Sequence, residues 1–349
     1  MLAKQFGGAE RSFVDICRAL ASRGHEILAI CENRSEALNI VQQFTDVAVK
    51  SVTVHGSWDL FARRTIRQYL EEFDPDIAQM HLARAAHLAG PVARRLGIPS
   101  VAKTHNYVNP KYYRTISKMV PTTARQQEYL RLAGISDERI SRIPNFSAIA
   151  PVATIGEAGK TTGAPLRVVG IGRLVKKKGF DLLLHAVAVA KQGGLELTLA
   201  IAGSGSERDA LERLSCDLNL EDVVTFLGWQ DNVRACLCAA DVFVLPSREE
   251  PFGIVCLEAM ALRVPIIATR TDGPCEILDE HSAILIDGED PDVLAQALQR
   301  IASEPDQAAQ RSMTAQQHFA RNYSEQAVVT QYLALYADLL ESAGHSNDA

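Results

Sequence analysis

The feature that most constrains the fold is an alternation, repeated through both halves of the chain, of short apolar runs rich in Val, Ile and Leu with segments of helical periodicity. Parallel strands need crossover helices to connect them, so this alternation is typical of parallel sheets covered by helices. The length of 349 residues exceeds one ordinary domain of about 150 residues. The sequence therefore predicts an α/β fold with two doubly wound, Rossmann-like domains.

The period of the apolar residues gives the expected elements. In the first half, strands are expected at residues 27–31, 47–54, 77–80, 100–103 and 140–143, with helices at 9–23, 58–73, 83–96 and 123–133. In the second half, strands are expected at 166–171, 197–202, 223–226, 242–245, 265–268 and 284–286, with helices at 181–191, 207–218, 233–240, 253–262 and 291–303.

The domain boundaries follow from composition. Residues 149–165 are rich in Gly, Ala, Thr and Pro and poor in large apolar side chains, which predicts a linker. It separates an N-terminal domain at 1–148 from a C-terminal domain at 166–323, and the last helical pattern, 324–342, is expected to pack back on the first domain. A doubly wound domain opens with a strand, yet only MLAKQF precedes Gly7. Either this segment is the stub of that strand or the true start lies upstream.

Charge is distributed unevenly along the chain. Residues 1–150 carry 20 Lys and Arg against 14 Asp and Glu, whereas the remainder carries 16 against 28. The basic half suggests an anionic partner, such as a phospholipid headgroup or a phosphorylated acceptor, or else incidental scatter on solvated faces. A pI near 5.9 and the lack of a recognisable module argue against nucleic-acid binding.

Cysteine content and hydropathy predict a cytoplasmic protein. The seven cysteines form an odd set without a C-x-x-C pair, and they are interpreted as reduced, buried small hydrophobes. No run approaches the roughly 18 apolar residues of a membrane span, and the start is too short for a signal peptide. Peripheral contact with the inner face of the membrane through the basic half remains open.

Glycine-rich turns supply the first candidate binding residues. Gly7 and Gly8 stand where a strand would meet a helix, so their amides are able to face an anion; a tight turn is the alternative. The dinucleotide fingerprint G-x-G-x-x-G fails, because Val175 and Arg208 occupy its third glycine position in the two candidate segments.

The second domain offers a more specific set of charged residues. Arg173 and Lys178 follow its first strand, at the edge where open α/β sheets bind ligands, and two cations there suit a diphosphate. Further on, Glu250 precedes Gly253, which opens a helix that contains Glu258. Backbone donors at that helix start are able to bind phosphate, while Glu250 is able to accept hydrogen bonds from sugar hydroxyls.

At this point the sequence resembles the family-4 retaining glycosyltransferases of the GT-B fold (glycosyl transferases group 1). The E-x7-E signature reads Glu250-PFGIVCL-Glu258, and the segments GRL…KG, IAGSGSE, ADVFVLPS and EAMA occur in the expected order over about 320 residues. The resemblance implies two domains with a cleft between them. It also implies sugar transfer from a nucleoside diphosphate sugar with retention of configuration and without a divalent metal or other cofactor.

The resemblance also assigns roles to individual residues. Arg173 and Lys178 would neutralise the departing diphosphate, Glu250 would bind the donor sugar, and Glu258 would bind the ribose. His105, in VAKTHN, matches the histidine that points at the donor sugar, and the acceptor would attack from the front face without a dedicated base. The remaining donor-binding residues would be Gly7, Gly8, Gly203, Gly205, Phe252, Gly253, Ile254 and Val255.

Several points remain open at this stage. His81 is expected to line the acceptor cleft. The acceptor is expected to be a glycan or a lipid-linked molecule, with lipopolysaccharide or exopolysaccharide assembly favoured by family analogy, and a lipid or a small molecule is left open. The alternatives are a nucleotide-sugar epimerase of the same fold and a non-catalytic sugar-nucleotide-binding protein. Two positions depart from the family pattern: Arg263 replaces a usual glycine, and Asp272 stands in a usual Gly-Gly pair. The aromatic and basic side chains near Trp58 and in PKYYRTISK suit either a membrane contact or a plain amphipathic helix.

Overall fold

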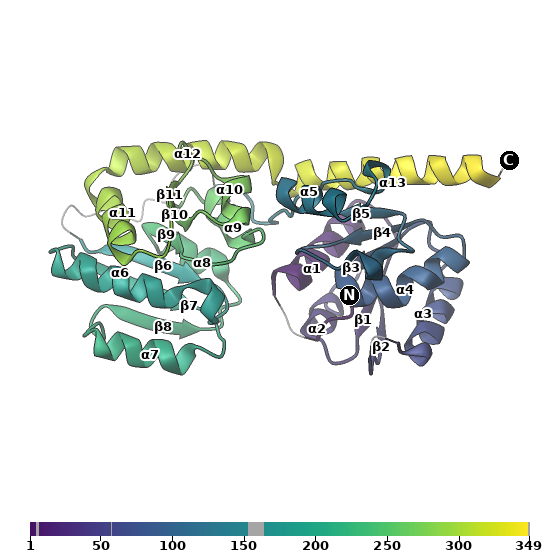
Figure 1. The fold of residues 1–349 in the computed structure, drawn as a ribbon, viewed down its shortest axis with the longest axis horizontal. Coiled ribbons are helices and arrows are strands. Elements are labelled where there is room, and N and C mark those ends of the chain that lie inside the picture. Colours follow the sequence, from purple (N-terminus) through teal and green to yellow (C-terminus); the bar gives the residue numbers. More distant parts are fainter. Residues whose placement is uncertain (5–6, 57, 153–163, 348–349) are drawn as a thin grey trace. The chain divides into compact units, whose positions relative to one another are not determined.

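The computed structural model describes residues 1–4, 7–56, 58–152 and 164–347. The chain divides into an N-terminal unit, Met1–Phe146 with Glu325–Ala349, and a C-terminal unit, Ser147–Ser324 (Figure 1). The boundary between the two units thus lies between Phe146 and Ser147. The sequence predicted it two residues later, between residues 148 and 149. Most of the expected linker, residues 153–163, lies outside the described residues.

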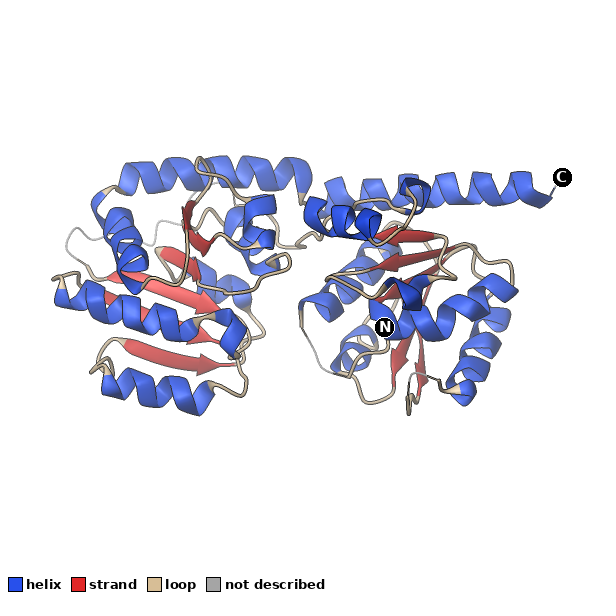
Figure 2. Cartoon of the chain, in the orientation of Figure 1, coloured by secondary structure: helices blue, strands red, loops and turns tan. Residues whose placement is uncertain are grey.

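The C-terminal unit is built on a parallel sheet with the strand order β11-β10-β9-β6-β7-β8 (Figure 2). Its strands are β6 (Leu166–Ile171), β7 (Leu197–Ala202), β8 (Val224–Gly228), β9 (Val242–Leu245), β10 (Ile266–Thr269) and β11 (Ile284–Ile286). The chain runs outward from β6 through β7 to β8 and then returns to β9 on the other side of β6. This reversal between β6 and β9 is the place where doubly wound sheets open a crevice for ligands.

Helices cover both faces of this sheet and enclose a core on each side. They are η3 (Lys176–Lys178), α6 (Phe180–Gln192), α7 (Arg208–Asp217), α8 (Val233–Cys238), α9 (Ile254–Ala261), α10 (Asp272–Ile277), α11 (Pro291–Ser303) and α12 (Pro305–Asn322). Strands β9 and β10 are buried throughout, as expected for continuous apolar runs in a parallel sheet.

The N-terminal unit contains two parallel sheets, one formed by β1 and β2 and one formed by β3, β4 and β5. Its elements are α1 (Gly8–Ala21), β1 (Ile27–Glu32), α2 (Glu36–Val41), β2 (Val47–Val52), α3 (Leu60–Phe73), β3 (Ala78–His81), α4 (Leu82–Arg95), β4 (Ser100–Lys103), η1 (Pro110–Tyr113), β5 (Lys118–Val120), α5 (Ala124–Leu132), η2 (Asp137–Arg139) and α13 (Glu325–Asn347). The strand expected at 140–143 is wrong. In that segment only Ile140 forms a β-bridge, to Met119. The third strand of the sheet that contains β3 and β4 is β5, which is too short to show an apolar periodicity.

The start of the chain lies beside β1, on the side away from β2. The amino group of Met1 donates to the carbonyl of Ile30 over 2.8 Å, and the Met1 carbonyl accepts from the amide of Glu32 over 3.2 Å. The described residues 1–4 form no strand, and a cavity of about 760 Å³ lies beside them, lined by β1, β3, α3 and α13. Burial lowers the pKa of the Met1 amino group.

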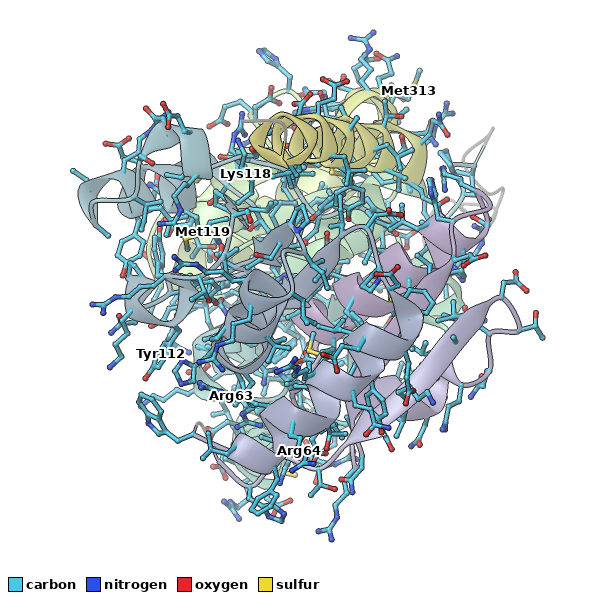
Figure 3. All side chains as sticks on the ribbon, turned by 90° about the vertical axis from the view of Figure 1, so that its right-hand side faces the viewer. Arg63, Arg64, Tyr112, Lys118, Met119 and Met313 are labelled. Atoms are coloured by element: carbon cyan, nitrogen blue, oxygen red, sulfur yellow. The ribbon has the colours of Figure 1, made fainter. Side chains whose placement is uncertain are left out.

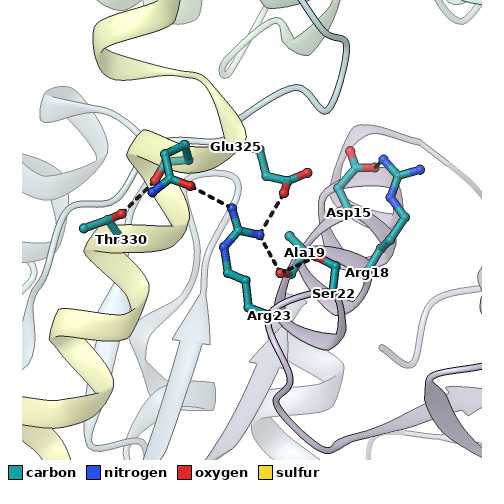
Figure 4. A network of polar contacts seen from close by, with 8 residues as sticks. Asp15, Arg18, Ala19, Ser22, Arg23, Glu325 and Thr330 are labelled. Atoms are coloured by element: carbon teal, nitrogen blue, oxygen red, sulfur yellow. Dashed lines mark hydrogen bonds and ion pairs between the residues drawn. The ribbon is translucent and has the colours of Figure 1, made fainter.

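The last helix packs within the N-terminal unit. Val328, Val329 and Tyr332 of α13 share a core with Ile16 of α1 and Val101 of β4. At its start, Arg23 donates to the carboxylate of Glu325 over 2.8 Å, tying α13 to the end of α1 (Figure 4). Within the residues described, no helix is both long and apolar enough to span a bilayer.

Candidate active site

Backbone hydrogen bonds lock together the loops that follow β6 and β7. The amide of Gly172 donates to Ala202 over 3.0 Å, and the amide of Leu174 donates to Ser204 over 2.8 Å. Two glycines make this approach possible. A Cβ on Gly203 would stand 1.8 Å from the carbonyl oxygen of Gly172, and both Gly203 and Gly205 have positive φ. These two glycines are therefore required for the loops to pack against each other, whether or not they also contact a ligand.

Lys178 and Glu250 meet at the reversal point of the sheet. Lys178 ends η3, after β6, and Glu250 lies in the loop after β9. The Lys178 ammonium forms an ion pair and a hydrogen bond with the Glu250 carboxylate, and their side chains are only 15% and 9% exposed. They are 72 positions apart in the sequence, and the fold brings them together at the edge of the sheet where doubly wound folds bind ligands. Arg173 is exposed in the same loop as Lys178.

The loop that carries Glu250 leads into α9. Gly253 caps this helix with φ 88°, and Ile254 and Val255 form its first turn, where amides lack intrahelical acceptors. The side chain of Phe252 is buried against Tyr323, so only its backbone is available to a ligand. Glu258 is buried on the next turn of α9.

A clamp that sequence analysis missed holds the Lys178 turn in place. Arg248 donates to both carboxylate oxygens of Asp181, over 2.7 and 2.8 Å, and to the carbonyl of Lys176 over 2.9 Å. Burial works to raise the pKa of Asp181, but the hydrogen bonds and charge of Arg248 outweigh it and lower that pKa. Asp181 and Arg248 are 67 positions apart, so no local pattern could have paired them.

In the N-terminal unit, a chain of hydrogen bonds ends on His105. Tyr336 of α13 donates to the Gln79 side-chain oxygen over 2.5 Å. The Gln79 amide nitrogen lies 3.0 Å from Nε2 of His81, and Nδ1 of His81 lies 3.0 Å from Nε2 of His105. Burial is the main reason that the pKa values of both histidines lie well below the usual range. Both rings are therefore neutral at neutral pH.

With the Gln79 side-chain nitrogen facing His81, this chain assigns one protonated nitrogen to each ring. Because the Gln79 amide donates, Nε2 of His81 accepts, and the hydrogen of neutral His81 sits on Nδ1. That hydrogen is donated to Nε2 of His105, which leaves the hydrogen of His105 on Nδ1. His81 was expected to contact the acceptor, but the structure buries its ring and engages both of its nitrogens.

The Gly7-Gly8 turn lies at the start of α1. The helix begins at Gly8 with Gly7 as its N-cap, so its free amides are where the sequence placed them. Gly7 has an extended backbone with φ −167°, so its conformation does not itself demand glycine.

Two family models match this chain. Residues 6–147 match the model described as Glycosyltransferase Family 4, and residues 158–318 match Glycosyl transferases group 1. The lipopolysaccharide core biosynthesis glycosyltransferase LpsD of Rhizobium meliloti (strain 1021) is 32% identical over 333 residues, which cover 95% of each chain. LpsE of the same organism is 30% identical and covers 95% of this chain and 96% of its own. The chain belongs to the family-4 glycosyltransferases.

The fold of this glycosyltransferase is GT-B. A crystal structure of HepE from Anabaena, in complex with UDP and glucose, matches with a TM-score of 0.82 at 20% identity and covers 96% of this chain and 98% of its own. The fold class expected from the sequence is therefore confirmed.

The two departures of this glycosyltransferase from the family pattern have structural explanations. Arg263 has φ 56°, the left-handed conformation that favours glycine, and its side chain donates to Gln316 over 2.6 Å. A Cβ on Gly273 would lie 2.3 Å from the carbonyl oxygen of Phe252. The amide of Gly273 donates to the backbone carbonyl of Glu250 over 2.8 Å. The glycine kept in the Asp272-Gly273 pair is thus the one that supports the Glu250 loop.

The cysteines of the glycosyltransferase are free, but the expectation that they are buried is only partly right. Cys17, Cys31 and Cys256 are buried, whereas Cys216, Cys238 and Cys275 are exposed. Apolar sequence neighbours do not decide which face of a helix a residue occupies, and these exposed residues lie on α7, α8 and α10. Across the described ranges, no cluster of three or more His, Cys, Asp or Glu side chains is arranged to hold a metal ion.

Proposed function

We propose that this glycosyltransferase moves a sugar from a nucleoside diphosphate donor to a hydroxyl of a lipopolysaccharide core acceptor, with retention of configuration and without a metal. The pairing of Lys178 with Glu250 at the sheet reversal carries the donor assignment. The acceptor class rests on LpsD and LpsE, which match along almost the whole chain.

The residues of the C-terminal unit supply the chemistry of the leaving group. In the resting site, Glu250 neutralises Lys178; a bound diphosphate takes over as the partner of this cation, and Glu250 turns to the donor sugar hydroxyls. Arg173 adds a second cation, and the amides of Ile254 and Val255 add donors at the start of α9. Fixed positive charge of this kind stabilises a departing diphosphate in place of a metal ion.

The role of His105 follows from its tautomer. Neutral, with its hydrogen on Nδ1, the ring acts as a hydrogen-bond donor to the transferred sugar rather than as a base. The acceptor hydroxyl loses its proton to the leaving phosphate, so the reaction needs no other base.

A thermal-shift screen tests the donor site. The full chain is measured with nucleoside diphosphates and their sugars, uridine compounds first, with and without EDTA. A ligand at 100 times its dissociation constant stabilises a protein by about 2.7 kcal/mol. We expect an EDTA-resistant shift that Glu250→Ala reduces and that Glu249→Ala, a change at the exposed neighbouring carboxylate, preserves.

Product analysis then separates the alternatives. Transfer to core oligosaccharide with the donor's anomeric configuration supports the proposal. Conversion of the donor without an acceptor would identify an epimerase, and binding without turnover would identify a non-catalytic protein. A shift abolished by EDTA would overturn metal independence.

A further inference from the structure

An unusual group of apolar side chains faces solvent at the start of α3. Trp58, Leu60 and Phe61 are 77%, 73% and 85% exposed, although Ala62, Ile66 and Leu70 bury the opposite side of the same helix. Single exposed apolar residues are common, but neighbouring large ones mark a surface that contacts something other than water.

Aromatic contacts extend this surface to the turn η1. The ring of Trp58 meets that of His87 edge to face at 5.0 Å, and His87 meets Tyr112 at 5.4 Å. The ammonium of Lys111 lies over the Tyr112 ring at 4.9 Å. We call the surface formed by Trp58, Leu60, Phe61, Arg64, Lys111 and Tyr112 the aromatic–basic patch; Figure 3 shows Arg64 and Tyr112 on one face, with Arg63 beside them.

The charge of the aromatic–basic patch is positive. Asp59, between Trp58 and Leu60 in the sequence, caps α3, and its carboxylate accepts from the amides of Ala62 and His55, each over 2.9 Å. Among the described residues, neither Arg64 nor Lys111 has an ion-pair partner, whereas Arg67, one turn further, is paired with Glu71. The surface therefore presents apolar tips together with cations that carboxylates do not neutralise.

We propose that the aromatic–basic patch docks this glycosyltransferase on an anionic phospholipid surface. Tryptophan and phenylalanine insert at the level of the headgroups, and lysine and arginine at that level attract anionic lipids. Exposed rings and cations without carboxylate partners together fit a lipid surface. At the depth of the headgroups, the rings contact apolar lipid while the cations contact anionic phosphate groups. This proposal rests on the proposed function, because the lipid surface would be the one that carries the acceptor of the glycosyltransferase. Vesicle binding is measured without donor or acceptor, so it tests docking separately from sugar transfer.

Vesicle flotation of the full chain tests the proposal. We expect binding to vesicles of phosphatidylcholine with about 30% phosphatidylglycerol, weak binding to phosphatidylcholine alone, and weakening by salt. Trp58 is one of only two tryptophans, so in a Trp229→Phe background its fluorescence should shift to the blue on binding. Failure to bind anionic vesicles, or equal binding to neutral ones, overturns the proposal.

Two pairs of variants separate the apolar and the charged contributions. Trp58→Ser with Phe61→Ser should lower vesicle affinity more than 10-fold, whereas Leu132→Ser, at a side chain 81% exposed on α5, should not change it. Arg64→Gln with Lys111→Gln should lower affinity about 30-fold. Arg94→Gln with Arg95→Gln, a matched loss of exposed charge at the end of α4, should have a much smaller effect.

Control measurements keep the outcomes distinct. Thermal unfolding verifies that each variant is folded, and its donor-induced thermal shift should equal that of the original chain. If the patch variants bind vesicles as well as the original, the proposal is wrong. If they instead dissolve an oligomer seen without vesicles, the patch is a protein contact and the lipid assignment fails. Vesicle binding without any donor shift would leave docking intact and refute the proposed function alone.

Discussion

The two units place their functional residues in different ways. In the C-terminal unit, the loops after β6, β7 and β9 are held by backbone hydrogen bonds, and glycines allow the backbones to touch. In the N-terminal unit, the orientation of His105 depends on side chains from β3 and the distant helix α13. The difference teaches that backbone contacts between loops, together with the Arg248–Asp181 clamp, hold the candidate residues of the C-terminal unit, whereas side-chain hydrogen bonds link His105 to β3 and α13.

The units also handle buried charge differently. The C-terminal unit neutralises Arg248 with Asp181 and Lys178 with Glu250. The N-terminal unit buries Lys103, which donates to Tyr332 and to two carbonyls, and burial lowers its pKa well below the usual range. The N-terminal unit also pairs a buried carboxylate, Asp15, with Arg11. The contrast is therefore between such ion pairs and Lys103, which has no carboxylate partner among the described residues, and the two arrangements should respond differently to mutation and to pH.

The largest expected effect is loss of the C-terminal fold by Gly203→Ala. The added Cβ would stand 1.8 Å from a backbone oxygen at φ 145°, so we expect a loss of more than about 4 kcal/mol of unfolding free energy in a denaturant titration. Gly194→Ala is the control: its φ is 86°, but nothing lies within 4 Å, so strain alone should cost about 1 to 2 kcal/mol. Equal losses would show that loop contact is unimportant.

Removing the Lys178 cation from the proposed donor site has the next largest expected effect. Lys178→Met should lower kcat/KM about 1000-fold, because a fixed positive charge at the leaving diphosphate is lost. The exposed neighbour variant Lys176→Met keeps the carbonyl that Arg248 binds and should retain nearly full activity. Similar rates for both variants, measured in a transfer assay, would remove Lys178 from the mechanism.

Reversing the hydrogen-bond chain tests the side-chain control of the N-terminal unit. In Gln79→Glu the carboxylate accepts from Nε2 of His81, so His105 should carry its hydrogen on Nε2 instead of Nδ1. We expect kcat to fall about 100-fold with donor affinity retained, and nitrogen NMR of the imidazoles to show the tautomer change. Tyr332→Phe is the control. It removes a hydroxyl of α13 that is not part of this hydrogen-bond chain, so the tautomer of His105 should stay unchanged. A tautomer unaffected by Gln79→Glu would contradict the assignment.

The smallest expected effect is a difference between the two units in how far a fall in pH lowers their stability. The pKa values of His81 and His105 lie below 6.5 in the folded unit, so unfolding takes up protons and the N-terminal unit loses stability as pH falls below about 6.5. The lowered pKa of Asp181 instead preserves its contribution until pH falls below about 3.8. Between pH 7 and 5, the protection of backbone amides from hydrogen exchange, measured relative to their intrinsic exchange rates at each pH, should therefore fall in β3 and β4 before it falls in β6 and β9. The reverse order would contradict this account.

Much of the C-terminal site was predictable from the sequence because its determinants are local. The strand expected at 166–171 is β6 with the same limits, and Lys178 and Glu250 follow strands that the fold places side by side. The clamp between Arg248 and Asp181 was not predictable, because an arginine after a strand has many possible partners until the fold selects one.

The N-terminal unit was less predictable. β5 has three residues, too few to show an apolar period, so the sequence did not predict it, and the strand predicted at 140–143 is absent. His81 gave no sign of its partners: Gln79 is close in sequence, but Tyr336 is 257 positions from Gln79.

The sequence by itself determined the alternation of strands and helices, the glycine-bearing turns and the spacing of the charged residues in the C-terminal half. These properties depend on backbone conformation and on local apolar periodicity, which act over a few residues. Only the tertiary structure decided the pairing of Lys178 with Glu250, the tautomer of His105 and the exposure of the aromatic–basic patch. Burial and hydrogen-bond partnership are properties of groups brought together from distant positions, so they exist only once the chain has packed.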